Sequence, residues 1–162
     1  MLRGSHIHAL LEFLPTLPVP DWPSAAAYLL PSAPDLDDLL REATRNIGAS
    51  ALAHLWDAGA LPEVGITADL PGLGRMQGVI DRLILRHDTV LIVDFKSNAQ
   101  VPETATTCPE GLLRQMGAYA AMAAQVWPGK RIDTAILWTR SSTLMALPHD
   151  LVTGALVRAA AT

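Results

Sequence analysis

Residues Gly78–Lys96 read GVIDRLILRHDTVLIVDFK, and the rest of the chain is interpreted outward from this stretch. Two apolar runs rich in valine, isoleucine and leucine flank the polar break RHD, which predicts two strands joined by a short turn. Each run carries one aspartate, Asp81 or Asp94, and Lys96 closes the stretch. Because a buried charge without a partner is costly, three charged groups inside apolar strands indicate a functional site.

The turn between the strands sets which side chains face each other. If the dipeptide at 87–88 is a two-residue hairpin loop, Asp81 pairs directly with Asp94. The same register pairs Val79 with Lys96. Directly opposed residues have Cβ atoms about 5 Å apart, so two carboxylates repel there unless a cation lies between them or one takes a proton. A hard divalent ion such as Mg²⁺ suits these oxygen ligands.

Lys96 shares a strand face with Asp94, because alternate strand residues point the same way. Its amine could therefore hold a water or hydroxide as nucleophile beside a bound ion, or offset phosphate charge. The structural alternative is a plain salt bridge between Lys96 and one aspartate, with Arg82 solvating the other side. The register of both aspartates with the lysine favours the functional interpretation.

The other expected elements follow from hydrophobic spacing and from turn residues. They are a helix over 7–14, a short helix over 22–30, a long helix after an Asp35 N-cap with a break near Gly48, a strand over 63–70, a loop over 98–110, a helix over 112–126, a strand over 132–139 with a hairpin partner over 143–147, and a closing helix over 149–160. This order predicts an α/β fold with a mixed sheet flanked by helices.

Composition limits the class of protein. The chain has 162 residues, 50% of them hydrophobic and 17% charged, which indicates one globular domain over 1–162. The net charge of −4 gives no global basic signature, so a nucleic-acid partner has to be argued from the site or from other chains. The single Cys108 excludes an intrachain disulfide and suits a reducing cytoplasm. No segment approaches the roughly 20 apolar residues of a membrane helix, and the abrupt start beside a helix suggests a fragment of a longer chain.

Four further polar residues are candidates, each with a simpler structural interpretation. His8 lies on the first helix, where a histidine is more often a surface or half-buried residue. Glu63 begins a strand and could be a metal or water ligand, although an exposed glutamate at a strand end is more common. Gln115 and Tyr119 lie one turn apart on the helix over 112–126, where Tyr119 also falls on the packing stripe.

Several motifs occur together in the chain and resemble a known family. They are R-G-x-x-x-H at Arg3–His8, G-x-I-D-R-L at Gly78–Leu83, V-D-F-K at Val93–Lys96, L-R-Q-M-x-x-Y at Leu113–Tyr119, and W-P-G-K-R at Trp127–Arg131. The set resembles the PD-(D/E)XK nuclease superfamily. Within it, the match is to the RecB-like nuclease domain at the C-terminus of the AddA subunit of helicase–nucleases. The resemblance covers nearly the whole chain in the right order.

The resemblance implies a restriction-endonuclease-like core and a role for each candidate. It implies that the metal ligands are His8, Asp81, Asp94 and the backbone carbonyl of Phe95, that Lys96 positions or activates the attacking water, that Gln115 and Tyr119 organise the site or contact DNA, and that Glu63 joins the outer shell. The implied cofactor is Mg²⁺, for which Mn²⁺ substitutes. The implied activity is hydrolysis of phosphodiester bonds in DNA, exonucleolytic on single strands, during double-strand break repair and recombination.

The resemblance also implies partners. A helicase portion of the same parent chain would feed single strands to the site, and a second, AddB-like subunit would complete the assembly. The chain itself has no Walker A pattern, so it is not expected to hydrolyse ATP. The alternatives are a stand-alone exonuclease, an enzyme acting on branched DNA, a catalytically silent module that keeps the fold to bind DNA or protein, and a scaffold with a structural salt bridge.

Overall fold

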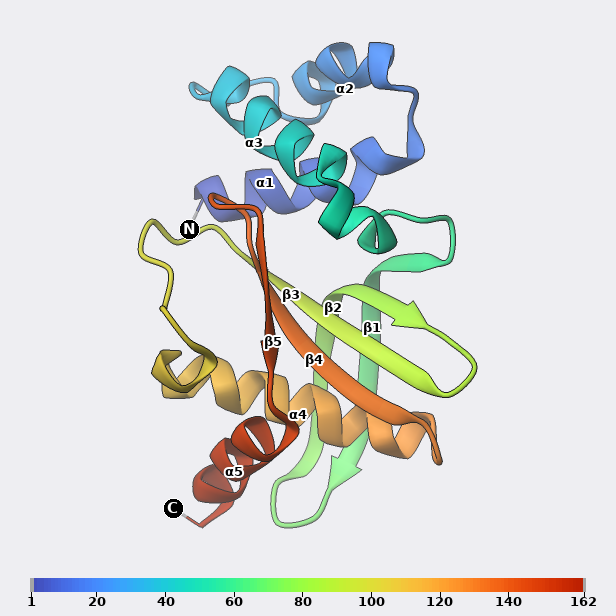
Figure 1. Ribbon diagram of the computed structural model, residues 1–162, viewed down its shortest axis with the longest axis vertical. Coiled ribbons are helices and arrows are strands. Elements are labelled where there is room, and N and C mark those ends of the chain that lie inside the picture. Colours follow the sequence, from blue (N-terminus) through green and yellow to red (C-terminus); the bar gives the residue numbers. More distant parts are fainter. Residues whose placement is uncertain (1, 162) are drawn as a thin grey trace.

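A five-stranded sheet separates two groups of helices in the computed structural model, which describes residues 2–161 (Figure 1). The strands are β1 (Ala60–Leu70), β2 (Gly74–Leu85), β3 (Thr89–Lys96), β4 (Arg131–Trp138) and β5 (Thr143–Leu147). The α-helices are α1 (Leu2–Phe13), α2 (Trp22–Leu29), α3 (Leu36–Gly48), α4 (Glu110–Val126) and α5 (His149–Ala160). Short 3₁₀ turns, η1 (Leu14–Thr16), η2 (Val19–Asp21), η3 (Ser50–Leu55) and η4 (Ala105–Thr107), lie between them.

The strands occur in the sheet in chain order, β1-β2-β3-β4-β5. Neighbours are antiparallel except β3 and β4, which run parallel because α4 carries the chain back across the sheet before β4 begins (Figure 1). The predicted mixed α/β sheet flanked by helices is confirmed. Among the helices formed by residues 2–161, none is both long and apolar enough to cross a membrane.

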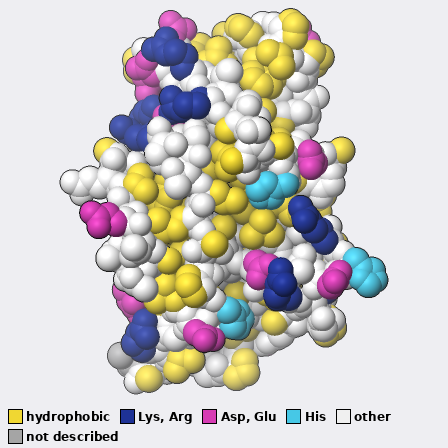
Figure 2. Space-filling model, viewed as in Figure 1, with side chains coloured by type: hydrophobic (Ala, Val, Ile, Leu, Met, Phe, Trp, Pro, Cys, Tyr) yellow, Lys and Arg dark blue, Asp and Glu magenta, His cyan; other side chains and the backbone are white. Residues whose placement is uncertain are grey.

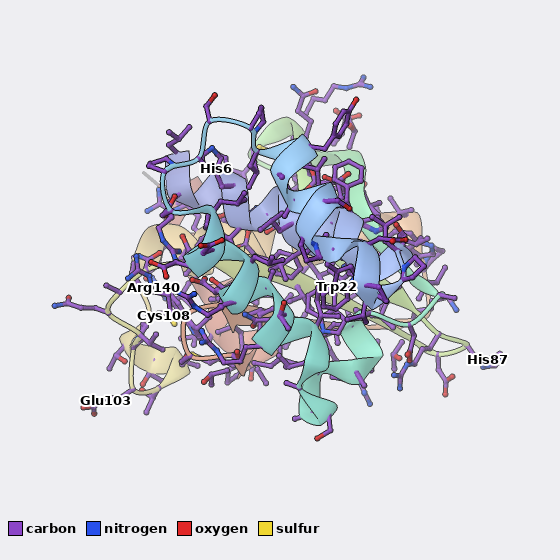
Figure 3. The ribbon with its side chains drawn as sticks, turned by 90° about the horizontal axis from the view of Figure 1, so that it is seen from above. His6, Trp22, His87, Glu103, Cys108 and Arg140 are labelled. Carbon is purple, nitrogen blue, oxygen red and sulfur yellow. The ribbon has the colours of Figure 1, made fainter. Side chains whose placement is uncertain are left out.

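One helical layer, formed by α1, α2 and α3, covers one part of the sheet. Ile7, Leu10 and Leu11 of α1 are fully buried against it, and Figure 3 shows Trp22 lying among the side chains of this layer. The predicted break at Gly48 is confirmed, since α3 ends there and a 3₁₀ turn continues the buried stripe. Asp35 occupies the N-cap position of α3 but makes no capping hydrogen bond with its side chain.

Helices α4 and α5 form the second layer. Their buried side chains pack with the β1–β2 ribbon and with β4 in a separate core cluster. Gly117 of α4 is needed for this contact, because a Cβ there would lie 2.2 Å from the carbonyl oxygen of Val152 on α5. The two layers therefore have independent cores that share only the sheet between them.

The β1–β2 ribbon changes the face that it buries along its length. Ile80 packs toward α4, whereas Ile84, at the same side-chain parity, packs toward α1 and α3. A regular strand cannot do this because its side chains alternate. The change coincides with a gap in the pairing: Pro62–Arg82 and Val64–Ile80 are paired, but Glu63 and Asp81 between them are not. Glu63 there has a φ of 48°, an uncommon conformation for a non-glycine residue.

The hairpin between β2 and β3 has the predicted register but ends early. Arg86 donates its N–H to the carbonyl of Thr89 at 2.9 Å, which closes the two-residue loop. Pairing runs from Leu85–Val90 to Arg82–Val93 and stops.

The expected direct pairing of Asp81 with Asp94, and of Val79 with Lys96, is therefore wrong. The ribbon turns over at Asp81, and its carboxylate accepts the Phe95 N–H at 2.7 Å in place of a ladder bond. Strand β3 continues alone beside β4 as far as Lys96.

Candidate active site

The notch where β2 leaves β3 brings His8 onto Asp81. Helix α1 packs through its apolar face, which turns His8 toward the open end of the hairpin. His8 Nδ1 lies 3.3 Å from Asp81 Oδ1, and His8 Nε2 lies 3.0 Å from the carbonyl oxygen of Phe95. An imidazole, a carboxylate and a backbone carbonyl from three elements thus meet at one point.

Glu63 also reaches this point. One ligand atom from each of His8, Glu63 and Asp81 lies within 4.8 Å of the others. Burial raises the pKa of Glu63, and the charges of Asp81 and Glu12 add to the rise. Two carboxylates at unpaired positions of adjacent strands repel each other, so a donor set of two carboxylates, an imidazole and a carbonyl fits a divalent cation.

Asp94 lies outside this group of three and faces α4. Its side chain is buried, forms an ion pair with Lys96 and accepts a hydrogen bond from Gln115 Nε2 at 3.3 Å. Burial raises the pKa of Asp94 even though Lys96 acts in the opposite direction, and the charge of Asp81 contributes to the rise. The salt bridge offered as a structural alternative is therefore present, and it coexists with the ligand group.

Arg82 does not solvate either aspartate. Arg82 is 3% exposed, and its guanidinium donates to the carbonyl of Leu11 at 2.6 Å and lies 5.0 Å from the centroid of the Trp56 ring. Burial lowers the pKa of Arg82, against the charges of Glu12 and Asp81. The residue fastens the C-terminal end of α1 to the sheet and so holds the helix that carries His8.

Gln115 and Tyr119 extend the site along α4. Gln115 Nε2 also donates to the Tyr119 hydroxyl at 3.2 Å, and that hydroxyl donates to the carbonyl of Val79 at 2.8 Å. Tyr119 is thus both a core residue, as its spacing predicts, and the end of a polar chain that begins at Asp94. A Cβ on Gly78 would lie 2.5 Å from Tyr119 Cε1, so any other residue there would force the tyrosine ring to move.

His8 can bind either a proton or a metal ion. Burial lowers the pKa of His8, but the hydrogen bond and the charge of Asp81 outweigh it, and the pKa lies above its ordinary value. Metal ligation requires an unprotonated imidazole nitrogen. A proton and a metal ion therefore compete for this side chain.

A second polar cluster, which the sequence analysis does not predict, is hydrogen-bonded to the backbone of Lys96. Glu42 of α3 is 4% exposed, accepts from Arg3 Nη2 at 2.6 Å and accepts from the hydroxyl of Thr139 at 2.6 Å. The N–H of Thr139 in turn donates to the carbonyl of Lys96 at 2.9 Å. The residues of this cluster are far apart in the sequence, so the sequence does not predict that they meet. The one local signal was a glutamate, Glu42, next to the apolar stripe of α3.

Comparison with known proteins identifies the family of the chain. No curated protein matches the chain. The family model of the PD-(D/E)XK nuclease superfamily matches residues 2–144, a span that holds all of the candidate residues. The chain therefore belongs to the PD-(D/E)XK nuclease superfamily.

Proposed function

We propose that this chain is a divalent-metal-dependent deoxyribonuclease that hydrolyses phosphodiester bonds. The observation that carries the proposal is the junction at Phe95. Its N–H binds Asp81 and its carbonyl faces His8, while Asp94 and Lys96 flank it on β3. One residue of backbone thus links the ligand group to the carboxylate–lysine pair, so a metal-associated water and the Lys96 amine could act on the same phosphate.

His8, Asp81, Asp94 and the Phe95 carbonyl would hold the ion, and Glu63 adds a further carboxylate. A divalent ion, Mg²⁺ or Mn²⁺, would polarise the phosphate and lower the pKa of a bound water. Lys96 orients the attacking water and offsets charge on the phosphate oxygens. Gln115 holds the Asp94 carboxylate at a fixed angle, and Tyr119 holds Gln115.

The finer assignment rests on the motif resemblance to AddA-type domains. In that assignment the domain acts exonucleolytically on single strands, which a helicase portion of a longer parent chain delivers, with an AddB-like second subunit. The setting is repair and recombination of broken DNA in the cytoplasm.

The test is cleavage of single- and double-stranded DNA in Mg²⁺ by wild type, Asp94→Ala and Lys96→Ala. Lys130→Ala removes the other lysine of the chain, at the far end of the β2–β3 hairpin, and is the matched control. We expect activity in wild type and the control, with at least a 100-fold loss in the two site variants. Equal activity in all four proteins would refute the assignment.

A catalytically silent module would behave differently. It would bind DNA without cleaving it, and Mn²⁺ would not bind between His8 and Asp81. Anomalous diffraction from crystals soaked in Mn²⁺ separates the two cases. Density far from these two residues would count against the nuclease assignment.

A further inference from the structure

An apolar groove of about 410 Å³ lies beside the candidate site. It is bounded by the β1–β2 turn, by α4 and by α5, which converge at the lower end of the molecule in Figure 1. Its lining is mostly aliphatic, with Leu73, Met76, Ala118, Met122 and Leu156. The groove is far larger than a packing defect and falls in the size range of small-ligand pockets.

The groove shares a wall with the candidate active site. Gln115 and Tyr119 line it, and the same two side chains form the hydrogen-bonded chain that ends on Asp94. A group in the groove therefore lies next to whatever is bound at Asp94. The α5 wall lies beyond residue 144, outside the segment that the family model matches.

The polar residues that line the groove are Gln77 of β2 and, on α4, Arg114, Gln115 and Tyr119. Glu110, the acid nearest along α4, accepts hydrogen bonds from Arg158 Nε and Nη2 at 3.0 and 3.2 Å. Arg114 forms no salt bridge with an acid among residues 2–161, although its charge contributes to the lowered pKa of Glu110, and its exposed side chain can meet an anion. An apolar groove whose lining includes one cation and the amides of Gln77 and Gln115 matches a flat, partly polar ring attached to a phosphate.

We propose that this groove binds the base of a nucleotide adjacent to the scissile phosphate. The aliphatic side chains contact the faces of the base, Gln77 meets its polar edge, and Arg114 binds the next phosphate. The proposal rests on the proposed nuclease function, because it takes the phosphate at Asp94 as its starting point. A base in a duplex is stacked and paired, so only an unstacked nucleotide can enter.

The test measures binding without cleavage. A short fluorescein-labelled single-stranded oligothymidine is titrated with wild type by anisotropy, once in EDTA and once in Ca²⁺. Gly111→Phe fills the groove, and a Cβ there meets nothing within 4 Å, so the helix tolerates it. Gly59→Phe is the matched control, because Gly59 is equally open and precedes β1, at the end opposite the β1–β2 turn.

We expect Gly111→Phe to bind about 10-fold more weakly, in line with the loss of apolar contact with one base, and Gly59→Phe to bind like wild type. An oligonucleotide with one abasic position should lose a similar factor with wild type and nothing further with Gly111→Phe. Arg114→Gln should weaken both oligonucleotides equally, whereas the same change at the exposed Arg86 should not.

Each other outcome overturns the proposal. If wild type and Gly111→Phe bind equally well, or if wild type binds the intact and abasic strands equally well, the groove does not bind a base. The absence of DNA binding in both buffers would also refute the proposal. A wild-type dimer on gel filtration that Gly111→Phe converts to a monomer would assign the groove to a second copy of the chain. Cleavage in Mg²⁺ is measured separately, so base-dependent binding without cleavage would refute only the nuclease function.

Discussion

At the scale of a single residue, the buried charge of Asp94 lowers the stability of the fold. The carboxylate is buried, and its pKa is raised by burial in spite of the adjacent Lys96. The folded state therefore holds the proton more tightly than the unfolded chain does. Stability falls as the pH rises from the ordinary value of 3.8 through the raised pKa, and it stays lower at neutral pH.

Replacing this carboxylate by an amide should stabilise the fold while removing activity. We expect Asp94→Asn to unfold at a higher temperature than wild type at pH 7 in EDTA, with about 2–4 °C for each kcal/mol gained. At pH 3 the difference should shrink, because wild type is then protonated. Calorimetry measures both, and Asp88→Asn, on the exposed hairpin loop, is the control. A lower melting temperature for Asp94→Asn would mean that the Lys96 ion pair outweighs burial.

Gly78 is the second residue with a specific requirement. A methyl group there would push Tyr119 away from Val79 and release Gln115 from Asp94. We expect Gly78→Ala to cost about 1–3 kcal/mol of stability through overpacking and to lower kcat about 10-fold or more. Gly65→Ala is the control, because a Cβ on Gly65 meets nothing within 4 Å.

A double variant tests the mechanism of this loss. Tyr119→Leu removes the ring that the new methyl would strike. If the clash is the cause, Gly78→Ala should cost little stability when added to Tyr119→Leu, since contacting residues are not additive. If the stability losses of the two single variants simply add, the clash with Tyr119 is not the cause of the Gly78→Ala effect.

At the scale of elements, the site is produced by the turning over of the β1–β2 ribbon. The unpaired positions Glu63 and Asp81 sit at the point where the buried face changes. There β2 separates from β3, and α1 delivers His8 into the notch. Strain at Glu63 and repulsion between the two carboxylates are thus concentrated where a cation would relieve the repulsion.

Removing the charge at Glu63 tests this account. Glu63→Asn keeps a residue that tolerates positive φ and removes the carboxylate. We expect it to raise the melting temperature slightly in EDTA and to reduce the increase that Mg²⁺ or Mn²⁺ produces in wild type. Differential scanning calorimetry with and without each metal measures both effects. The control is Glu103→Gln, which Figure 3 places on an outlying loop. An unchanged metal-induced increase would exclude Glu63 from the ligand set.

At the scale of the whole molecule, charge limits how the protein can hold DNA. The net charge is −4, and Figure 2 shows lysine and arginine side chains interleaved with acidic ones on that face rather than gathered into one stripe. Affinity for a polyanion must then come from a few local contacts and a bound cation.

The salt dependence of binding should reflect this. We expect the logarithm of the association constant for single-stranded DNA to fall with the logarithm of salt concentration at a slope of about −1 to −2, because few cations contact phosphates. Binding should also strengthen when Ca²⁺ replaces EDTA. Anisotropy titrations over a range of salt concentrations measure the slope, and a slope steeper than about −5 would reveal a basic surface that the fold does not provide.

Local sequence alone determined much of this protein. The strands, the two-residue hairpin loop and its register follow from apolar runs and a polar break, since side-chain alternation and turn chemistry act over a few residues. The break of α3 at Gly48 and the neighbouring positions of Gln115 and Tyr119 follow for the same reason.

Only the tertiary structure decided how those pieces meet. The β1–β2 ribbon changes its buried face at Glu63 and Asp81, and the β2–β3 pairing ends one pair before the two aspartates. As a result, Asp81 contacts His8, and Asp94 forms an ion pair with Lys96. This change of buried face depends on which helical layer each part of the ribbon must cover. Packing between distant segments sets that choice, and no local pattern encodes it.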